Sequence, residues 1–171
     1  MTDFVAYEPS VKSFGPVTDF EIRSALMSDV EALASVMAMR GGSVEDHVEH
    51  ARHLIEQLDV LLVAVRGDAL VGWSGIQKFS IHAGGAPEWL IAGLTVVPEA
   101  RRRGVAGQLL SEVLRATSQA APAEPIFSVI NARNLASIDL HEGLGFAEIE
   151  RGATFEGIEF TGGEGVLLRR P

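Results

Sequence analysis

The residues that could do chemistry begin with a basic, glycine-containing run in the middle of the chain. Three consecutive arginines at 101–103 stand directly before Gly104, and a β-branched apolar segment at 94–97 precedes them. A helical pattern starts near Gly104. The first N–H groups of a helix have no intrahelical acceptor, and the helix dipole makes that end positive. Such an end binds phosphate, so the sequence predicts a loop that holds the pyrophosphate of a nucleotide-containing cofactor.

The elements that must position this loop alternate between strands and helices. Apolar and β-branched runs between turn residues predict strands at 20–24, 58–65, 70–77, 89–97, 126–130, 146–151 and 160–169. Apolar positions at helical spacing predict helices that begin near residues 29, 43, 103 and 135. Ser28-Asp29 with Glu31 has the pattern of a capping box, and Asn134 that of an N-cap. This order predicts an α/β fold with a central mixed sheet.

Composition limits the classes of function. The chain has 171 residues, the size of one domain, and a net charge of -9, which argues against a nucleic-acid partner. Without cysteine there is no disulfide, thiolate zinc site or cysteine nucleophile. No apolar run has a membrane helix's length and no secretory signal is visible, so we expect a cytoplasmic protein without a membrane partner. We expect residues 1–17 to form an arm and residues 18–171 one domain.

Two blocks of the sequence resemble the GNAT superfamily of acetyl-CoA-dependent N-acetyltransferases. Residues 101–106 fit the family's (Gln/Arg)-x-x-Gly-x-(Gly/Ala) loop, with Val96-Val-Pro98 before it. Residues 134–146 resemble its Asn-x-x-(Ala/Ser) helix, which ends in a Leu-Gly-Phe turn. The resemblance covers about residues 20–169. It implies a single-domain GNAT-like fold, a mixed, mostly antiparallel sheet with strands splayed at the cofactor cleft, and acetyl-CoA as cosubstrate.

The resemblance also implies which residues bind the cofactor. Backbone groups of the strand before the loop would pair with the pantetheine arm, and the loop amides would hold the pyrophosphate. Asn134 would touch the pantetheine arm, or would act only as a helix cap. The arginine run is interpreted as phosphate-binding, with a plain charged turn as the alternative. The expected cofactor contacts are Leu94, Thr95, Val96, Arg101, Arg102, Arg103, Gly104, Val105, Ala106, Gly107 and Asn134.

The expected catalytic residues are His141 and Glu88. His141 stands where many members of the family carry a tyrosine that gives a proton to the departing CoA thiolate. A protonated imidazole, with an ordinary pKa near ~6.5, can do the same; the alternative is packing beside the thiol. Glu88 is the nearest acid on the strand that leads to the loop, and would take a proton from the attacking amine. It could instead be only a polar residue at a strand start.

Other acidic and histidine residues offer weaker signals. Glu31, Glu45 and Asp46 lie near the starts of the first two helices, which usually line the acceptor site in the family. Histidines at 47, 50 and 53 could place two imidazoles on one helix face, but a solvated face is the preferred interpretation, and no metal site is predicted.

The glycine-rich stretch and the tryptophans also have ordinary structural interpretations. Residues 162–165 would border the acceptor site or form a bulge. Trp73 and Trp89 are interpreted as sheet packing.

The sequence thus predicts an N-acetyltransferase that moves an acetyl group to a primary amine of a small molecule or peptide by direct attack. The acidic net charge mildly favours a cationic acceptor. The alternative is a non-catalytic acyl-CoA-binding or interaction module on the same fold. A homodimer is an expectation from the family alone.

Overall fold

The computed structural model describes residues 19–155 and 157–171, which fall into two compact units. The N-terminal unit comprises residues 19–76 and 92–120, and the C-terminal unit comprises residues 77–91 and 121–171 without residue 156. Strands β3 (Ala69–Ser80) and β4 (Pro87–Val96) contribute residues to both units. The predicted arm at residues 1–17 lies outside the described residues, and the single domain over 18–171 stays a prediction.

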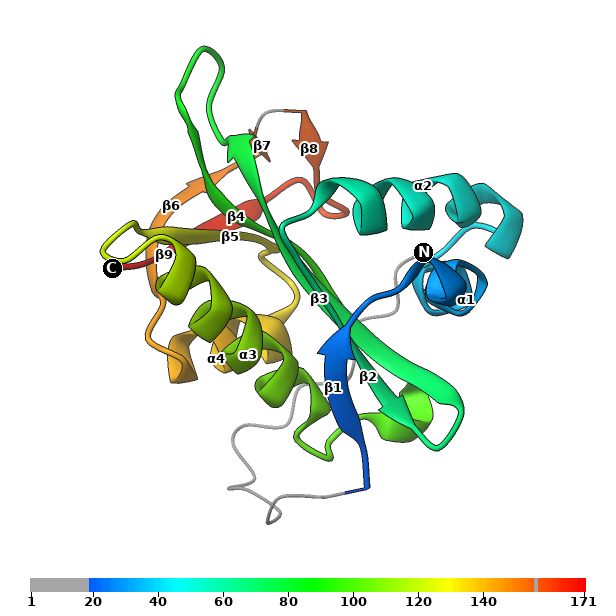
Figure 1. Cartoon of the computed structure of the whole chain (residues 1–171). Coiled ribbons are helices and arrows are strands. Elements are labelled where there is room, and N and C mark those ends of the chain that lie inside the picture. The colour runs from blue at the N-terminus through cyan, green and yellow to red at the C-terminus, as the bar shows by residue number, and fades with distance from the viewer. Residues whose placement is uncertain (1–18, 156) are drawn as a thin grey trace. The chain divides into compact units, whose positions relative to one another are not determined.

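The N-terminal unit is an antiparallel sheet with helices on both faces (Figure 1). Its own elements are β1 (Glu21–Ser24), η1 (Met27–Asp29), α1 (Val30–Ala38), α2 (Val44–Gln57), β2 (Val60–Arg66), η2 (Pro98–Ala100) and α3 (Val105–Ala120). Neighbouring residues of a strand point to opposite faces. Gly72 accordingly lies against Leu109 of α3, while Trp73 packs in the core that contains α1 and α2. Leu33, Leu109 and the β2 residue Val63 are fully buried.

The start of α1 differs from the sequence-based prediction. Ser28 and Glu31 were expected to form a capping box at its start. Ser28 lies instead inside the 3-10 turn η1, and the N-cap residue is Asp29, whose side chain makes no capping hydrogen bond to α1. The Asp29 carboxylate instead accepts a hydrogen bond from the Leu26 N–H (2.7 Å) and a two-pronged one from the Arg23 guanidinium (2.7 and 2.9 Å). Arg23 comes from β1, so a tertiary partner that local sequence does not reveal replaced the predicted capping box.

The second helix follows its prediction. The Ser43 hydroxyl accepts from the Asp46 N–H (3.2 Å), and the Asp46 carboxylate accepts from the Ser43 N–H (2.9 Å). This reciprocal pair is a complete capping box. It holds the pKa of Asp46 below its usual value, chiefly through the Ser43 N–H.

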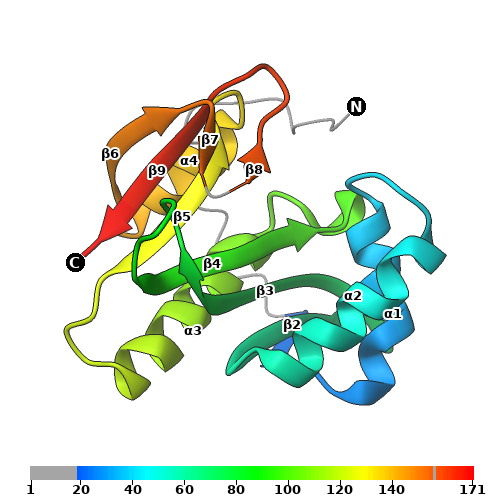
Figure 2. The same ribbon diagram turned by 90° about the horizontal axis from the view of Figure 1, so that it is seen from above.

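The C-terminal unit contains the remaining strands, parts of β3 and β4, and the helix α4 (Figure 2). Its own elements are β5 (Ile126–Asn131), α4 (Leu135–Gly143), β6 (Ala147–Gly152), β7 (Thr154–Phe155), β8 (Ile158–Glu159) and β9 (Gly165–Arg170). Strand β5 pairs in parallel with β4 and antiparallel with β9, and β6 pairs antiparallel with β9. A small core of Ile81, Leu90, Phe155 and Leu167 lies within this unit.

The last strand is shorter than the sequence predicts. It begins at Gly165 rather than near residue 160, because Gly162 and Gly163 have positive φ and form a turn. The short β7–β8 hairpin was not expected. A bulge was one alternative for residues 162–165, whereas register shifts of the sheet occur between Glu148 and Glu150 and between Ala64 and Val65.

The fold class is α/β with a mixed, mostly antiparallel sheet, as predicted. Among the described residues, no helix has the length and apolar character needed to cross a membrane.

The Arg23–Asp29 pair makes stability depend on pH. Arg23, through its hydrogen bonds first, lowers the pKa of Asp29 in the folded chain. The stabilisation is therefore complete above the unfolded pKa of ~3.9 and is lost as the pH falls through the lower folded pKa. We expect Asp29→Asn to lower the free energy of unfolding at pH 7 by about 1–3 kcal/mol, and the difference to shrink on acidification. Urea unfolding at several pH values measures this.

The exposed Glu56→Gln on α2 is the charge-matched control and should show no such loss. A difference between Asp29→Asn and the native chain that does not change with pH would contradict this account.

Candidate functional site

The candidate site in the N-terminal unit is the turn between β4 and α3. The 3-10 turn η2 follows β4, and the Arg101 Nε donates back to the Val96 carbonyl (3.0 Å). Arg102 and Gly104 then adopt positive φ values of 60° and 82°. Glycine takes this conformation at little cost, whereas arginine does so only under constraint. The turn thereby reverses the chain within a few residues and starts α3 at Val105.

The first turn of α3 presents its amides outward. The Gln108 N–H donates to the Gly104 carbonyl (3.0 Å), the first bond of the helical series. The preceding N–H groups at 105–107 therefore have no intrahelical acceptor. A Cβ placed on Gly104 would meet no atom of the described residues within 4 Å. Amides without an intrahelical acceptor, at the positive end of a 16-residue helix, have the chemistry that favours binding of an anion.

Strand β4 directs alternate backbone groups to its two sides. The Val97 N–H donates to the Val71 carbonyl of β3 (2.9 Å), so the backbone groups of Val97 and Thr95 face β3. Those of Leu94 and Val96 face the other way. Thr95 was expected to offer its backbone groups to the pantetheine arm, but these groups face β3. Its side chain is buried as well. Its hydroxyl has no partner among the described residues, which a buried water would explain.

The three arginines of the turn have different surroundings. Arg101 is half-buried and holds the Val96 carbonyl, as described above. Arg103 is exposed and lies 3.8 Å from Asp19, which also approaches Arg66 at 3.9 Å. Arg102 is exposed. The predicted basic run is therefore one structural arginine followed by two at the surface.

Arg40 is a residue that the sequence reading missed. It follows α1, where it resembles an ordinary cation at a helix C-terminus. Its Nη1 reaches the Leu94 carbonyl on β4 at 3.5 Å, a long hydrogen bond. Burial first, and then the nearby charge of Arg101, lower the pKa of Arg40. No local pattern could have indicated this contact, which joins residues 54 positions apart.

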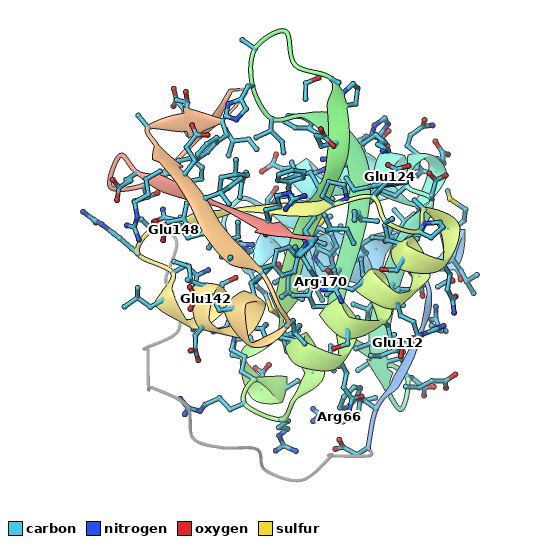
Figure 3. All side chains as sticks on the ribbon, turned by 90° about the vertical axis from the view of Figure 1, so that its left-hand side faces the viewer. Arg66, Glu112, Glu124, Glu142, Glu148 and Arg170 are labelled. Carbon is cyan, nitrogen blue, oxygen red and sulfur yellow. The ribbon has the colours of Figure 1, made fainter. Side chains whose placement is uncertain are left out.

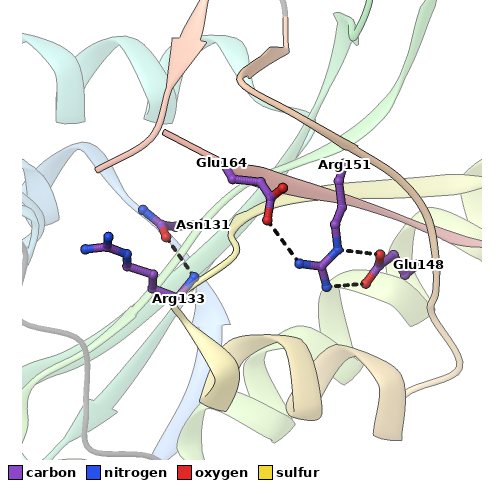
Figure 4. Close-up of polar contacts among 5 residues, drawn as sticks. All are labelled: Asn131, Arg133, Glu148, Arg151 and Glu164. Atoms are coloured by element: carbon purple, nitrogen blue, oxygen red, sulfur yellow. Dashed lines mark hydrogen bonds and ion pairs between the residues drawn. The ribbon is translucent and has the colours of Figure 1, made fainter. Parts of the chain in front are cut away.

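In the C-terminal unit, the predicted Asn134 begins α4 as an N-cap. Its side-chain oxygen accepts from the Ser137 N–H (3.3 Å). The preceding loop is held by Asn131, which accepts from the Arg133 N–H (2.9 Å) and donates to the Thr161 carbonyl (2.8 Å). Figure 4 shows this contact with Arg133 beside the ion pairs of Arg151. The capping role is therefore present, and cofactor contact stays a prediction.

The glycine-rich stretch is tied to the same loop. The Glu164 carbonyl accepts from the Ala132 N–H (3.1 Å), and the Glu164 carboxylate pairs with Arg151 (3.1 Å). Arg151 also makes a two-pronged pair with Glu148 (2.7 and 2.9 Å; Figure 4), and these carboxylates raise its pKa. These contacts tie the turn at residues 162–164 to β6 and to the loop before α4.

His141 is buried in the C-terminal unit, with a side chain that is 1% exposed. Its Nδ1 lies 2.7 Å from the Ser137 carbonyl, which can only accept, so Nδ1 carries the hydrogen. Nε2 lies 3.1 Å from the Ser128 hydroxyl on β5 and accepts from it in the neutral ring. Burial lowers the pKa of His141, and the Ser137 carbonyl only partly offsets this. The ring also packs edge-to-face on Phe146 (5.1 Å).

These contacts favour the packing alternative for His141 over the acid role. A general acid must be protonated and must reach the leaving group, and this imidazole is kept neutral with both nitrogens engaged. The turn that follows α4 supports the same arrangement. Gly145 takes a φ of 90°, the Phe146 N–H donates to the His141 carbonyl (3.1 Å), and Arg170, labelled in Figure 3, donates to the Leu144 carbonyl (3.1 Å).

The acids named from the sequence are dispersed. Glu88 is half-buried near the start of β4, in the C-terminal unit. Glu31 and Glu45 are exposed on α1 and α2, and Asp46 is occupied as a cap. The structure thus brings the β4 end and the loop together in one unit, while Glu88, Asn134 and His141 belong to the other.

The weaker sequence signals have structural explanations. The His47 Nε2 binds the Gly41 carbonyl (2.7 Å), and the described residues hold no histidine–acid cluster that fits a metal ion. The ring of Trp73 covers Gly93 within the sheet, and the ring of Trp89 lies 4.4 Å from the Lys78 ammonium.

The structure is thus an α/β protein in which a strand, a tight turn and a helix follow one another at β4, residues 101–104 and α3. The family model described as the acetyltransferase (GNAT) domain matches residues 35–163. The chain therefore belongs to the GNAT acetyltransferase family, as the two sequence blocks indicated.

Similar proteins span nearly the whole chain. An N-alpha-acetyltransferase of Saccharolobus solfataricus is 23% identical over 159 residues, which are 90% of this chain and 93% of that protein. A phosphinothricin acetyltransferase of Sinorhizobium meliloti, solved with acetyl-CoA, is 19% identical at a TM-score of 0.71, with 90% and 89% of the two chains covered. Arabidopsis thaliana Naa50, solved with a bisubstrate analogue, is 16% identical at a TM-score of 0.71, with 90% and 99% covered.

The surroundings of His141 predict how its replacement behaves. His141→Phe should leave the pH–rate profile of acetyl transfer unchanged, because the neutral imidazole supplies no proton. It should lower the free energy of unfolding by about 1–3 kcal/mol, because the buried Ser128 hydroxyl loses its partner. Steady-state rates across pH and urea unfolding measure the two effects.

Ser128→Ala is the matched variant, and the double variant should recover part of the lost stability because it removes the unpaired hydroxyl. A rate loss of ~10²-fold in His141→Phe, with one limb of the pH profile missing, would restore the acid role.

Proposed function

We propose that this chain transfers the acetyl group of acetyl-CoA to a primary amine of a small molecule or peptide, by direct attack of the amine on the thioester. The proposal is carried by the N–H groups of residues 105–107, which have no intrahelical acceptor, and by the free space at the Cβ position of Gly104 beside them. A diphosphate has the size and charge for such a site, since helix N-termini bind phosphates through several amides at once.

The proposed cofactor contacts follow the predicted residues. The turn from Arg101 to Gly107 holds the diphosphate, with the exposed Arg102 and Arg103 adding positive charge. The outward backbone groups of Leu94 and Val96 pair with the amides of the pantetheine arm. Asn134 contributes from the start of α4. Similar folds solved with acetyl-CoA or a CoA-containing analogue support acetyl-CoA as the cosubstrate.

In the proposed chemistry the protonated amine loses two protons and the leaving thiolate gains one. The amine attacks only after it loses the first, and Glu88 takes that proton directly or through a water. The amine nitrogen then forms a bond to the acetyl carbonyl carbon, the carbon–sulfur bond breaks, and the nitrogen gives its second proton to water. Because His141 is buried and neutral, the leaving thiolate receives its proton from water. His141 then serves to hold α4 against β5.

Similar proteins support two classes of acceptor. One similar protein is an N-alpha-acetyltransferase and another acetylates phosphinothricin, according to their names. A peptide amino terminus and a small-molecule amine are therefore both within the proposal. A cytoplasmic location, a homodimer and the lack of a nucleic-acid partner stay predictions from the sequence.

Transfer is tested by incubating the full chain with acetyl-CoA and a panel of primary amines. We expect free CoA thiol to appear together with an equal amount of N-acetylated product. Acetyl-CoA that binds but yields no product with any amine would favour the non-catalytic binding module. Thiol release without an acetylated amine would indicate hydrolysis instead.

Cofactor binding at the turn is tested by Ala106→Glu. Ala106 is partly buried against the core, so the thermal shift of each variant is measured from its own melting temperature without ligand. The added carboxylate repels the diphosphate. Acetyl-CoA at ~100 times its Kd should stabilise the native chain by roughly 2.7 kcal/mol, and Ala106→Glu should lose this thermal shift.

Gln108→Glu adds the same charge at an exposed position two residues further along α3 and should keep the shift. An undiminished shift in Ala106→Glu would place acetyl-CoA elsewhere.

A further inference from the structure

Two arginine side chains approach the same edge of β4. The Arg40 Nη1 lies 3.5 Å from the Leu94 carbonyl, and the Arg101 Nε lies 3.0 Å from the Val96 carbonyl. Both carbonyls face away from β3. All four residues belong to the N-terminal unit. Two positive charges are thus placed along the strand edge that leads to the turn.

Neither arginine forms an ion pair within the described part of the chain. Within residues 19–155 and 157–171, no carboxylate lies within 4.0 Å of Arg40 or Arg101, whereas Arg23, Arg103 and Arg151 all have one. Arg40 is an exposed residue, and partial desolvation and then the nearby charge of Arg101 lower the pKa of its guanidinium. Two like charges without a counterion are unfavourable in the free protein, and a bound anion relieves this.

A purely structural role explains only part of the Arg40 geometry. A cation after the last turn of a helix interacts favourably with the dipole, and the Arg40 N–H closes the end of α1 on the Met37 carbonyl (3.0 Å). This accounts for a positive residue at the position. It does not account for a guanidinium directed at β4 through one long bond, which leaves most of its donors for another partner.

The position along β4 indicates which anion Arg40 meets. Arg101 stands next to the turn, and Leu94 is two residues further away, ~7 Å along an extended strand. A donor whose diphosphate lies on the turn runs along this edge with its thioester at the far end. Arg40 is therefore placed toward the acyl end, where the acceptor amine must approach, rather than at the diphosphate.

We infer that the acceptor is a small, amino-acid-type amine that carries a carboxylate, and that Arg40 binds this carboxylate. The inference rests on the proposed function. A guanidinium binds a carboxylate through two parallel hydrogen bonds, which fixes the acceptor's orientation as well as its position. This acceptor differs from the cationic one that the net charge favours. Recognition of an acceptor depends on the charges at its binding site and not on the net charge of the whole protein.

The experiment compares acceptors that share an amine but differ in charge: α-amino acids, their α-carboxamides, and the amines without the carboxyl group. With the native chain, we expect kcat/KM to be highest for the carboxylate-bearing members. Arg40→Gln should lower kcat/KM for these by about 10- to 100-fold, the range for a lost charge-assisted hydrogen bond, mainly through the acceptor KM. Its activity with the carboxamides should not change.

Two further variants separate charge from geometry. Arg52→Gln on α2 removes one exposed arginine and should change nothing. Arg40→Lys keeps the charge but loses the two-pronged geometry, so it should restore only part of the activity. Thermal unfolding of each variant establishes that it is folded.

The outcomes distinguish the inference from the proposed function. Acetylation of carboxamides, simple amines or acidic peptides in preference to free amino acids would overturn the inference and leave the acetyltransferase intact. A raised KM for acetyl-CoA in Arg40→Gln, with the acceptor KM unchanged, would assign Arg40 to the cofactor and also overturn it. Acetyl-CoA binding without any product would overturn the proposed function and the inference with it.

Discussion

The reversal of the chain between β4 and α3 is the constraint on which the rest of the site depends. Two residues take positive φ there, and Arg101 bonds back to the strand it has just left. The helix that follows is anchored by Leu109 and Leu110, both fully buried. Because the helix is anchored, its first amides keep one direction, which suits an anion that binds without any side-chain donor.

The same reversal organises the strand before it. With Val97 bonded to β3, the alternation of a β-strand turns the backbone groups of Leu94 and Val96 outward. These groups are where an extended, amide-containing ligand would form hydrogen bonds. The Arg101 side chain is held by the Val96 carbonyl, and the Arg40 side chain reaches the Leu94 carbonyl through a longer hydrogen bond, so both positive charges lie along this edge.

His141 illustrates how a motif can predict a place without predicting a role. Its position in the Asn-to-Phe block is that of a proton donor in many relatives. In this chain the ring is enclosed by Ser128, Ser137 and Phe146. Burial disfavours the charged imidazole and lowers its pKa, and the hydrogen bond to the Ser137 carbonyl only partly offsets this. The side chain therefore contributes to the packing of α4 against β5.

Much of this protein could be predicted from its sequence. Apolar periodicity placed the four α-helices and most strands within a few residues, since each period reflects which face of an element is buried. The loop and Asn134 were identified because turns and helix caps have local chemistry: a positive φ favours glycine, and an N-cap needs a side-chain acceptor.

Tertiary structure decided what depended on distant partners. The start of α1 was mispredicted because Arg23 on β1 engages Asp29. Arg40 could not be identified because its contact spans 54 positions. The state of His141 depends on how completely β5 and α4 enclose it, and no spacing of residues reports burial. The sequence by itself therefore determined the elements and the turn before α3, whose causes are local. Only the folded chain decided which charges are paired and which titratable groups are buried, because both depend on how separate elements pack together.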